Sequence, residues 1–367
     1  MNWSGRNVLI TGGAGHIGSH LARELIKKGA NIRIADNLWR GKKEYLLDEN
    51  GTPILDFEKN FFELDLREMK NCEQAVKGMD TIFHLADVVA GIDFVFGNEA
   101  FVYRSNVLIN SNMFEAARNE KLEKLAYVGA ACAYPLEKQN DPNHPLFKEE
   151  DMYPAHPESS YGWGKLMGEY ECELYSRTGM LDASILRLHN VYGPKTDLSP
   201  ERSQVIPATI RKAIRYPEED FIIWGNGEQN RAFMYVSDIV DALILSLEKG
   251  VNKGPIQIGN STKTTINEIA DAVIEISGKN IEKANAREPG KTTSIVLQKL
   301  PVSILQVNGP LFFVSVQSLI KTYSNEGDTV LDNCMGSGST GVAAVKLNRK
   351  FIGVDISEKY IRIAKDR

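Results

Sequence analysis

The chain has 367 residues, 43% hydrophobic and 25% charged, a balance typical of a folded protein of about two domains of roughly 150 residues each. Its net charge of -5 argues against a protein that mainly binds phosphate backbones. We expect no membrane span, because no apolar run reaches ~18 residues, and no secretory signal. Four scattered cysteines without metal-like spacing predict a cytoplasmic protein with no disulfides and no metal site.

Strand-like and helix-like segments alternate along the first two hundred residues. Apolar runs at 7–10 and 31–35 flank a glycine-rich turn and a segment of helical periodicity. The alternation predicts an α/β fold with a Rossmann-type doubly wound parallel sheet, with further strands at 81–85, 125–128 and 184–188 and helices at 106–118 and 161–177. Shorter elements and turns between about 195 and 290 predict a smaller lobe that closes over a ligand. We therefore expect a dinucleotide-binding core over about 1–190 and a substrate lobe over about 191–290.

The glycine-rich turn predicts a dinucleotide site. Gly12, Gly15 and Gly18 allow a pyrophosphate to approach the backbone at the N-terminus of a helix. Asp36 ends the next strand, where a carboxylate accepts hydrogen bonds from both ribose hydroxyls and repels a 2′-phosphate. The pattern therefore favours NAD over NADP. Asp65 also follows a strand-like run, and either contacts the adenine or is a solvated turn residue.

A tyrosine and a lysine lie one helical turn apart further along the chain. Tyr161 and Lys165 have the i, i+4 spacing that places both side chains on the same side of a helix. A nearby ammonium and the positive nicotinamide ring both favour the phenolate form of a tyrosine. We therefore expect Tyr161 to exchange a proton with the substrate near neutral pH.

With these residues in place, the sequence resembles the extended short-chain dehydrogenase/reductases that act on nucleotide sugars. The resemblance covers about residues 5–290, and within that family it is strongest to GDP-mannose 3,5-epimerases and then to GDP-fucose synthases. It rests on TGGAGHIG at 11–18, ADNLWRG at 35–41, DTIFHLAD at 80–87, Asn106, ACAYP at 131–135, SSYGWGKLMGEYECELY at 159–175, RLHNVYGP at 187–194, VIPA at 205–208 and WGNGEQNRAFMYVSD at 224–238.

The resemblance implies roles for individual residues. Tyr161 and Lys165 would serve hydride transfer at the sugar, and Cys132 would be one acid/base, although a small buried hydrophobic residue is the other reading of Cys132. Asn190 and Arg231 would hold the diphosphate, and Gln204 would also touch the substrate, a GDP-sugar by preference. A homodimer through helices 106–118 and 161–177 is expected as well. The implied NAD-binding residues, besides the glycines, the acids, Tyr161 and Lys165, are His16, Ile17, Asn37, Leu66, Leu85, Ala86 and Leu188.

Two positions depart from the family pattern. Ala130 stands where these enzymes carry the serine or threonine that partners the tyrosine. Gln204 stands where they place a second acid/base, and an amide does not exchange a proton at neutral pH. The Thr-Asp-Glu pattern of the 4,6-dehydratases is also absent. Besides the 3,5-epimerase, a 4-epimerase or 4-reductase and a catalytically impaired nucleotide-sugar-binding protein therefore stay open as alternatives.

The C-terminal segment belongs to a different pattern. Residues 291–367 contain ten Lys/Arg and six Asp/Glu, whereas the rest of the chain is acidic, which predicts a boundary near Gly290. After a junction at 291–317, residues 318–367 resemble the end of adenine-N6 or cytosine-N4 DNA methyltransferases, in which residues matching Asp332, Gly336–Gly338 and Asp355 hold S-adenosylmethionine. The catalytic Asp/Asn/Ser-Pro-Pro-Tyr/Phe motif of those enzymes is missing. We therefore expect neither methyl transfer nor a nucleic-acid partner, and a DNA-binding relic stays open as a further alternative.

Overall fold

A computed structural model describes residues 1–141, 146–200, 202–286, 294–296, 327, 329–332 and 339–353. The chain divides into two compact units, Met1–Ala286 and Arg287–Arg367, and each is described by itself. Among the described residues, no helix combines the length and the apolar character that crossing a membrane requires.

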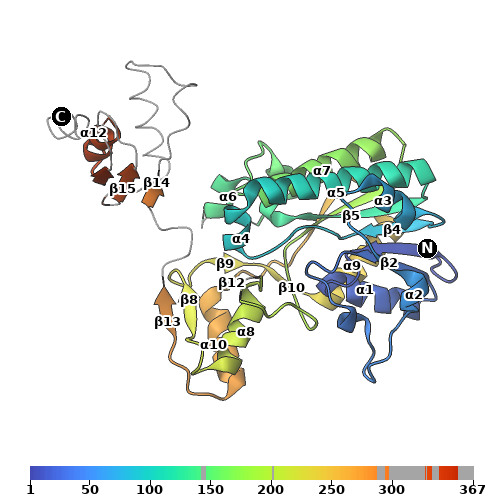
Figure 1. Cartoon of the computed structure of the whole chain (residues 1–367), viewed down its shortest axis with the longest axis horizontal. Coiled ribbons are helices and arrows are strands. Elements are labelled where there is room, and N and C mark those ends of the chain that lie inside the picture. Colours follow the sequence, from blue (N-terminus) through green and yellow to red (C-terminus); the bar gives the residue numbers. More distant parts are fainter. Residues whose placement is uncertain are drawn as a thin grey trace. The chain divides into compact units, whose positions relative to one another are not determined.

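A seven-stranded parallel sheet forms the centre of the first unit, as the alternating pattern predicts (Figure 1). The strand order is β11-β6-β5-β4-β1-β2-β3, so the chain reverses its direction of winding between β1 and β4. Ligands bind beyond the carboxyl ends of parallel strands at such a reversal. The strands are β1 (Asn7–Thr11), β2 (Asn31–Asp36), β3 (Phe61–Glu63), β4 (Thr81–His84), β5 (Lys124–Ala130), β6 (Ala183–Leu188) and β11 (Pro255–Ile258).

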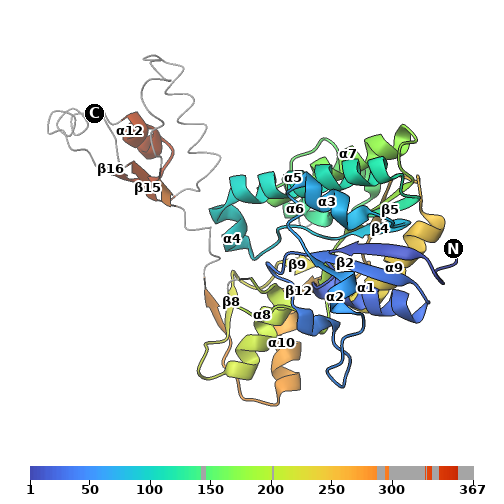
Figure 2. The same cartoon turned by 45° about the vertical axis from the view of Figure 1, so that its right-hand side comes forward.

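Helices cover both faces of this sheet because its strands are apolar on both sides. On one face, α1 (His16–Lys27) and α9 (Val236–Lys249) bury Leu21, Leu25 and Leu243 against the strands. On the other face lie α3 (Met69–Val76), α5 (Glu99–Glu120) and α7 (Ser160–Arg177), with Met113 and Phe114 in their core. The long helices α5 and α7 pack side by side in both views (Figures 1 and 2).

The substrate lobe is not a continuous segment, which corrects the expected division near residue 190. Helix α9 and strand β11 fall within 191–290 but belong to the main sheet, where β11 pairs with β6 from Pro255 to Ile258. The chain thus leaves the sheet after β6, builds part of the lobe, returns for α9 and β11, and completes the lobe afterwards. Apolar composition alone cannot distinguish these returning elements from lobe elements.

The lobe has its own small core. Helices α8 (Val205–Arg215) and α10 (Ile266–Ser277) pack on the strand pair β8 (Ile222–Trp224) and β13 (Ala284–Ala286), burying Phe221, Ile223 and Ile269 (Figure 2). Two further strand pairs, β7 (Asn190–Tyr192) with β10 (Phe233–Tyr235) and β9 (Asn230–Arg231) with β12 (Thr264–Thr265), complete the elements of this region. The short helices are η1 (Lys43–Leu46), α2 (Phe57–Asn60), α4 (Ile92–Gly97), η2 (Ala131–Ala133), α6 (Leu136–Asn140) and η3 (Glu149–Met152).

The second unit contains a strand–helix–strand arrangement. Strand β15 (Thr329–Asp332) pairs in parallel with β14 (Ser294–Val296) and β16 (Lys350–Gly353), and α12 (Ser339–Lys346) lies between β15 and β16 in the chain. The expected S-adenosylmethionine residues Gly336–Gly338 and Asp355 lie outside the described residues.

Candidate active site

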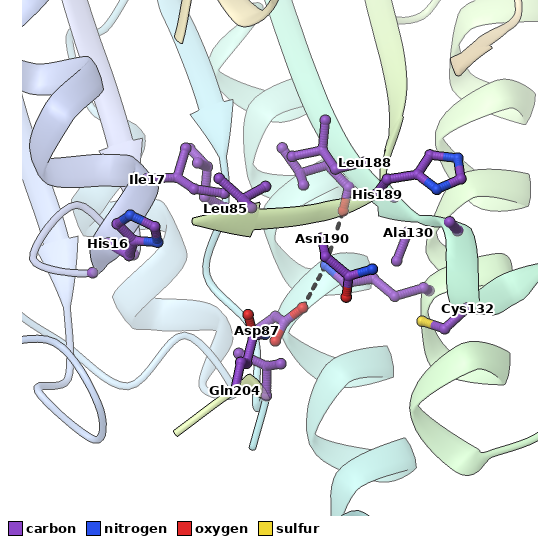
Figure 3. Close-up of a pocket in the computed structure, with 18 of the residues that line it drawn as sticks. His16, Ile17, Leu85, Asp87, Ala130, Cys132, Leu188, His189, Asn190 and Gln204 are labelled. Carbon is purple, nitrogen blue, oxygen red and sulfur yellow. Dashed lines mark hydrogen bonds and ion pairs between the residues drawn. The ribbon is translucent and has the colours of Figure 1, made fainter. Parts of the chain in front are cut away.

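A cavity of about 700 Å³ opens at the carboxyl ends of β1, β2, β4, β5 and β6 and extends to the lobe (Figure 3). In Figure 3, His16 and Ile17 lie on one side of the view and Cys132 on the other, with Asn190 between them and Asp87 and Gln204 below. The structure brings all the residues selected from the sequence to the wall of this cavity. They are Gly12, Gly15, His16, Ile17, Gly18, Asp36, Asn37, Asp65, Leu66, Leu85, Ala86, Cys132, Tyr161, Lys165, Leu188, Asn190, Gln204 and Arg231.

The glycine-rich turn has the geometry that a bound dinucleotide needs. Gly12 has a φ of +66°, which favours glycine, and a Cβ on Gly18 would lie 2.4 Å from the carbonyl oxygen of Gly12. The turn therefore packs tightly on itself and leads into the N-terminus of α1, whose free N–H groups suit a pyrophosphate. His16, the first residue of α1, has a buried Nε2 without a hydrogen-bond partner among the described residues, so this wall retains an unused polar atom.

Asp36 occupies the position expected for the ribose-binding acid. Its side chain is buried at the end of β2, where Oδ2 accepts a hydrogen bond from the Ala14 N–H at 3.0 Å and Oδ1 accepts one from the Leu38 N–H at 2.8 Å. These two bonds fix the carboxylate at the cavity wall, and each oxygen retains a second acceptor site. The site therefore fits a nucleotide with free ribose hydroxyls.

Asp65 also lines the cavity, but its carboxylate is already engaged. Arg67 donates to both of its oxygens, from Nε at 3.0 Å and from Nη2 at 2.5 Å. The Arg67 guanidinium lowers the pKa of Asp65 through these hydrogen bonds. A hydrogen bond from adenine would therefore reach a carboxylate that Arg67 already occupies, and the adenine role of Asp65 stays a prediction.

Tyr161 and Lys165 share a partner that the sequence reading missed. The phenol oxygen of Tyr161 donates to Asp87 Oδ2 at 3.1 Å, and Lys165 Nζ lies 2.5 Å from the same oxygen. Lys165 also donates to the Val128 carbonyl at 2.8 Å, and both its side chain and that of Asp87 are buried. Asp87 comes directly after β4, and its place at the end of a parallel strand is the signal that could have revealed it.

The structure pairs Lys165 with Asp87, which opposes one of the two effects expected to favour the phenolate of Tyr161. We expected the Lys165 ammonium to favour the phenolate, but in the structure that charge is paired with a carboxylate. Burial raises the pKa of Tyr161 well above its usual value, and the charge of Asp87 raises it further. The tyrosine is therefore a neutral phenol at neutral pH in this arrangement.

The start of α7 positions Tyr161 close to Cys132. Ser159 caps the helix by accepting a hydrogen bond from the Gly162 N–H. A Cβ on Gly162 would lie 2.5 Å from the Cys132 carbonyl oxygen, so only glycine permits this approach. Burial raises the pKa of the Cys132 thiol to about 12, although the nearby Lys165 acts in the opposite direction. Cys132 is therefore a neutral thiol at neutral pH, a better proton donor than acceptor.

The lobe contributes the predicted substrate residues. Arg231 on β9 is exposed, and Asn190 on β7 donates from Nδ2 to the Ala232 carbonyl at 3.4 Å. Gln204 is the N-cap of α8, and its side chain makes no capping hydrogen bond. The three side chains thus reach the cavity from separate short elements.

Two histidines near the carboxyl ends of β4 and β6, His84 and His189, differ in their hydrogen bonds. His84 is buried and bonded on both nitrogens, to Thr11 Oγ1 at 2.8 Å and to Asn110 Oδ1 at 3.1 Å, and burial lowers its pKa to about 3. It is therefore a structural residue. His189 is different, because its Nε2 is buried without a partner among the described residues.

A set of contacts between the β2–η1 loop and residues 195–202 was not foreseen. Asp197 lies 3.3 Å from Arg202 Nε and 3.9 Å from Arg40 Nε, and Tyr45 donates to the Thr196 carbonyl at 2.9 Å. These residues join the cofactor side of the cavity to the loop that leads into α8. The contacts of Arg40 and Tyr45 link residues more than 150 positions apart, which no local pattern reveals.

Comparison with known proteins now gives the family. The profile described as the NAD dependent epimerase/dehydratase family matches residues 8–259. The chain belongs to this family. A second profile, described as DNA methylase, matches residues 313–366, most of which lie outside the described part of the chain.

Individual members of the epimerase/dehydratase family show how far the similarity extends. GDP-mannose 3,5-epimerase from Arabidopsis thaliana is 33% identical over 281 residues, which cover 76% of this chain and 72% of the relative. The UDP-N-acetylglucosamine 4-epimerase structure from Methanobrevibacter ruminantium has a TM-score of 0.67 and 30% identity, covering 78% of this chain and 87% of that one. UDP-glucose 4-epimerase of Thermus thermophilus, solved with NAD, has a TM-score of 0.65 and 27% identity over 77% and 88% of the two chains.

Membership of this family makes NAD the cofactor, and the turn at Gly12–Gly18 together with Asp36 fits it. When bound, NAD supplies a nicotinamide ring that takes up and returns a hydride.

Proposed function

We propose that the chain is a nucleotide-sugar epimerase that oxidises the sugar transiently at C4, in the manner of a GDP-mannose 3,5-epimerase. The observation that carries this proposal is that Tyr161, Lys165 and Cys132 line one cavity with the cofactor-binding turn. Tyr161 exchanges a proton with the 4-hydroxyl of the sugar, and the Lys165 ammonium keeps a positive charge close to the phenol. Cys132 exchanges a proton at a carbon next to the transient ketone, where the C–H bond has become acidic.

The lobe side of the cavity binds the nucleotide part of the substrate. Arg231 and Asn190 hold the diphosphate, for which a guanidinium fork is well suited. The similarity to the Arabidopsis enzyme favours a GDP-sugar. The melting temperature of the NAD-loaded protein should therefore rise most with GDP-sugars in a panel that includes UDP- and dTDP-sugars, and a larger rise with a UDP-sugar would contradict the base assignment.

Two observations favour a second candidate, a 4-epimerase that returns the hydride to the opposite face of C4. The raised pKa of Cys132 leaves little thiolate to act as a base at neutral pH, and Gln204 supplies no exchangeable proton there. The 4-epimerase from Methanobrevibacter ruminantium shares the fold over most of the first unit.

Deuterium uptake separates the two candidates. In deuterated water, a 3,5-type reaction introduces deuterium into the sugar at a carbon beside C4, whereas a 4-type reaction introduces none. Cys132→Ser should abolish the uptake, because an alcohol is a far weaker base than a thiolate, while Cys172→Ser, at a buried cysteine that does not line the cavity, serves as the matched control. If turnover proceeds without deuterium uptake and Cys132→Ser leaves it unchanged, the 4-epimerase becomes the favoured function. Bound NAD with no turnover of any nucleotide sugar would instead indicate the impaired binding protein.

The assembly is proposed to be a homodimer. Helices α5 and α7 pack against each other and expose aromatic side chains, namely Phe101 and Tyr103 on α5 and Trp163 and Tyr170 on α7. A two-fold pairing of these helices would cover that apolar surface.

A further inference from the structure

Asp87 is the one carboxylate that contacts both members of the Tyr161–Lys165 pair in the described residues. Its Oδ2 accepts the phenol hydrogen of Tyr161 at 3.1 Å and lies 2.5 Å from Lys165 Nζ. Oδ1 is buried without a hydrogen-bond partner in the same part of the chain, so the carboxylate keeps acceptor capacity inside the cavity. Neither the family profile nor the relatives' names assign this residue a role.

The backbone around Asp87 is held from two sides. Thr11 Oγ1 accepts hydrogen bonds from the Leu85 and Ala86 N–H groups, both at 3.1 Å. On the other side, Asn106 of α5 pairs with Val88 in both directions, accepting its N–H at 2.6 Å and donating to its carbonyl at 3.2 Å. The backbone on both sides of Asp87 is therefore held between β1 and α5.

The charges around Tyr161 explain why it needs such a partner. Lys165 of α7 is paired with Asp87, Arg40 of the β2–η1 loop is near Asp197 as well as Asp87, and Cys132 and Tyr127 of the β5 side are both neutral at neutral pH. Both of these cations, Lys165 and Arg40, therefore lie beside carboxylates. Ala130 also supplies no hydroxyl to the phenol.

We propose that Asp87 replaces the hydroxyl absent at position 130 as the partner of Tyr161, and that it accepts the phenol's proton during oxidation of the sugar. The inference rests on the proposed function, because it assumes oxidation at C4. The proton of the sugar 4-hydroxyl passes to the phenol oxygen while the phenol's own proton passes to Asp87 Oδ2. The hydrogen on C4 leaves with its electron pair as a hydride to NAD, and the C4–O bond becomes a carbonyl. Reduction of the ketone reverses each transfer, so protons and electrons balance.

The first test follows Tyr161 itself and requires no substrate. The near-ultraviolet absorbance of phenolate is titrated in the NAD-loaded wild type and in Tyr161→Phe, and their difference reports Tyr161 alone. We expect Tyr161 to keep its proton at neutral pH in the wild type. In Asp87→Asn, Lys165 has lost its counter-charge, so phenolate should appear at least one pH unit lower. Phenolate near neutral pH in the wild type, or an identical titration in Asp87→Asn, would overturn the proposal.

The second test compares the pH dependence of kcat. Asp87→Asn keeps the size of the side chain but cannot take up the proton, so kcat at neutral pH should fall by roughly 10²-fold or more. It should then recover about tenfold per pH unit as Tyr161 ionises. An unchanged or higher kcat at neutral pH would show that Asp87 merely restrains Lys165. Asp241→Asn, an exposed carboxylate of α9, is the matched control and should behave as wild type.

The two tests distinguish a failure of the proposed function from a failure of the role of Asp87. If the wild type epimerises no nucleotide sugar, the proposed function is wrong, yet the titration still decides whether Asp87 holds Tyr161 in its neutral form. If epimerisation is robust and Asp87→Asn is fully active at neutral pH, the function stands and the role of Asp87 falls. If Asp87→Asn does not fold, the wild-type titration can still overturn the proposal, because it uses only Tyr161→Phe and phenolate near neutral pH would contradict a neutral Tyr161.

Discussion

Replacement of the Asp36 carboxylate by an amide should change which dinucleotide the chain prefers. The two backbone hydrogen bonds, from Ala14 and Leu38, hold the carboxylate where the 2′-position of the adenosine ribose is expected. Two unit charges of the same sign at about 4 Å repel by about 4 kcal/mol at an effective dielectric constant of about 20. Water and ions at the cavity mouth reduce this value, so we expect NAD to bind at least tenfold more tightly than NADP, which is about 1.4 kcal/mol.

Asp36→Asn removes the charge and should reduce the ratio of NAD affinity to NADP affinity at least tenfold. NAD itself should bind more weakly, because a hydrogen bond from ribose to an amide oxygen is weaker than one to a carboxylate. Isothermal titration of both cofactors at one fixed salt concentration measures the ratio. Asp241→Asn controls for the change in net charge and should leave the ratio unchanged. Equal affinity of the wild type for NAD and NADP would refute the assignment of Asp36.

Three further predictions concern stability, pH and assembly. Glu169→Gln should lower the free energy of unfolding by about 3–5 kcal/mol in urea titrations. The substitution breaks a buried ion pair in which Arg187 donates to Glu169 at 2.6 and 2.9 Å. A loss below about 1 kcal/mol would contradict this stabilising role of the pair. Deuterium uptake by the sugar should rise about tenfold per pH unit from neutrality, since the pKa of Cys132 is raised to about 12 and the thiolate fraction grows with pH; a flat profile would exclude Cys132 as the base. Light scattering at micromolar concentration should give a dimer that Trp163→Glu and Tyr170→Glu weaken, and a wild-type monomer would contradict the proposed pairing of α5 and α7.

The parts of the molecule that could be predicted depend on local chemistry. The turn at Gly12–Gly18 follows from the conformational freedom of glycine, and the Tyr161–Lys165 pair follows from helical spacing. Both patterns lie within a few residues of sequence, so the strand–turn–helix unit and the sheet class could be predicted from them.

The parts that could not be predicted depend on contacts between distant residues. Strand β11 joins the main sheet by pairing with the edge of β6 at Ile185–Leu188, and α9 packs on one face of that sheet. Asp87 meets Tyr161 across 74 positions, and its charge adds to the effect of burial in raising the pKa of the tyrosine. The neutral state of Cys132 likewise follows from its burial, which its surrounding sequence does not determine.

Oxidation of a nucleotide sugar through Tyr161 can be followed in one rapid-mixing experiment. The full-length, NAD-loaded protein is mixed with the nucleotide sugar that raises its melting temperature most, and the absorbance of reduced nicotinamide is followed. We predict a transient rise that decays as the epimer appears, and its loss in Tyr161→Phe, which should still bind NAD. Epimer formation with no reduced nicotinamide at any time, or a Tyr161→Phe trace equal to that of the wild type, would contradict the account.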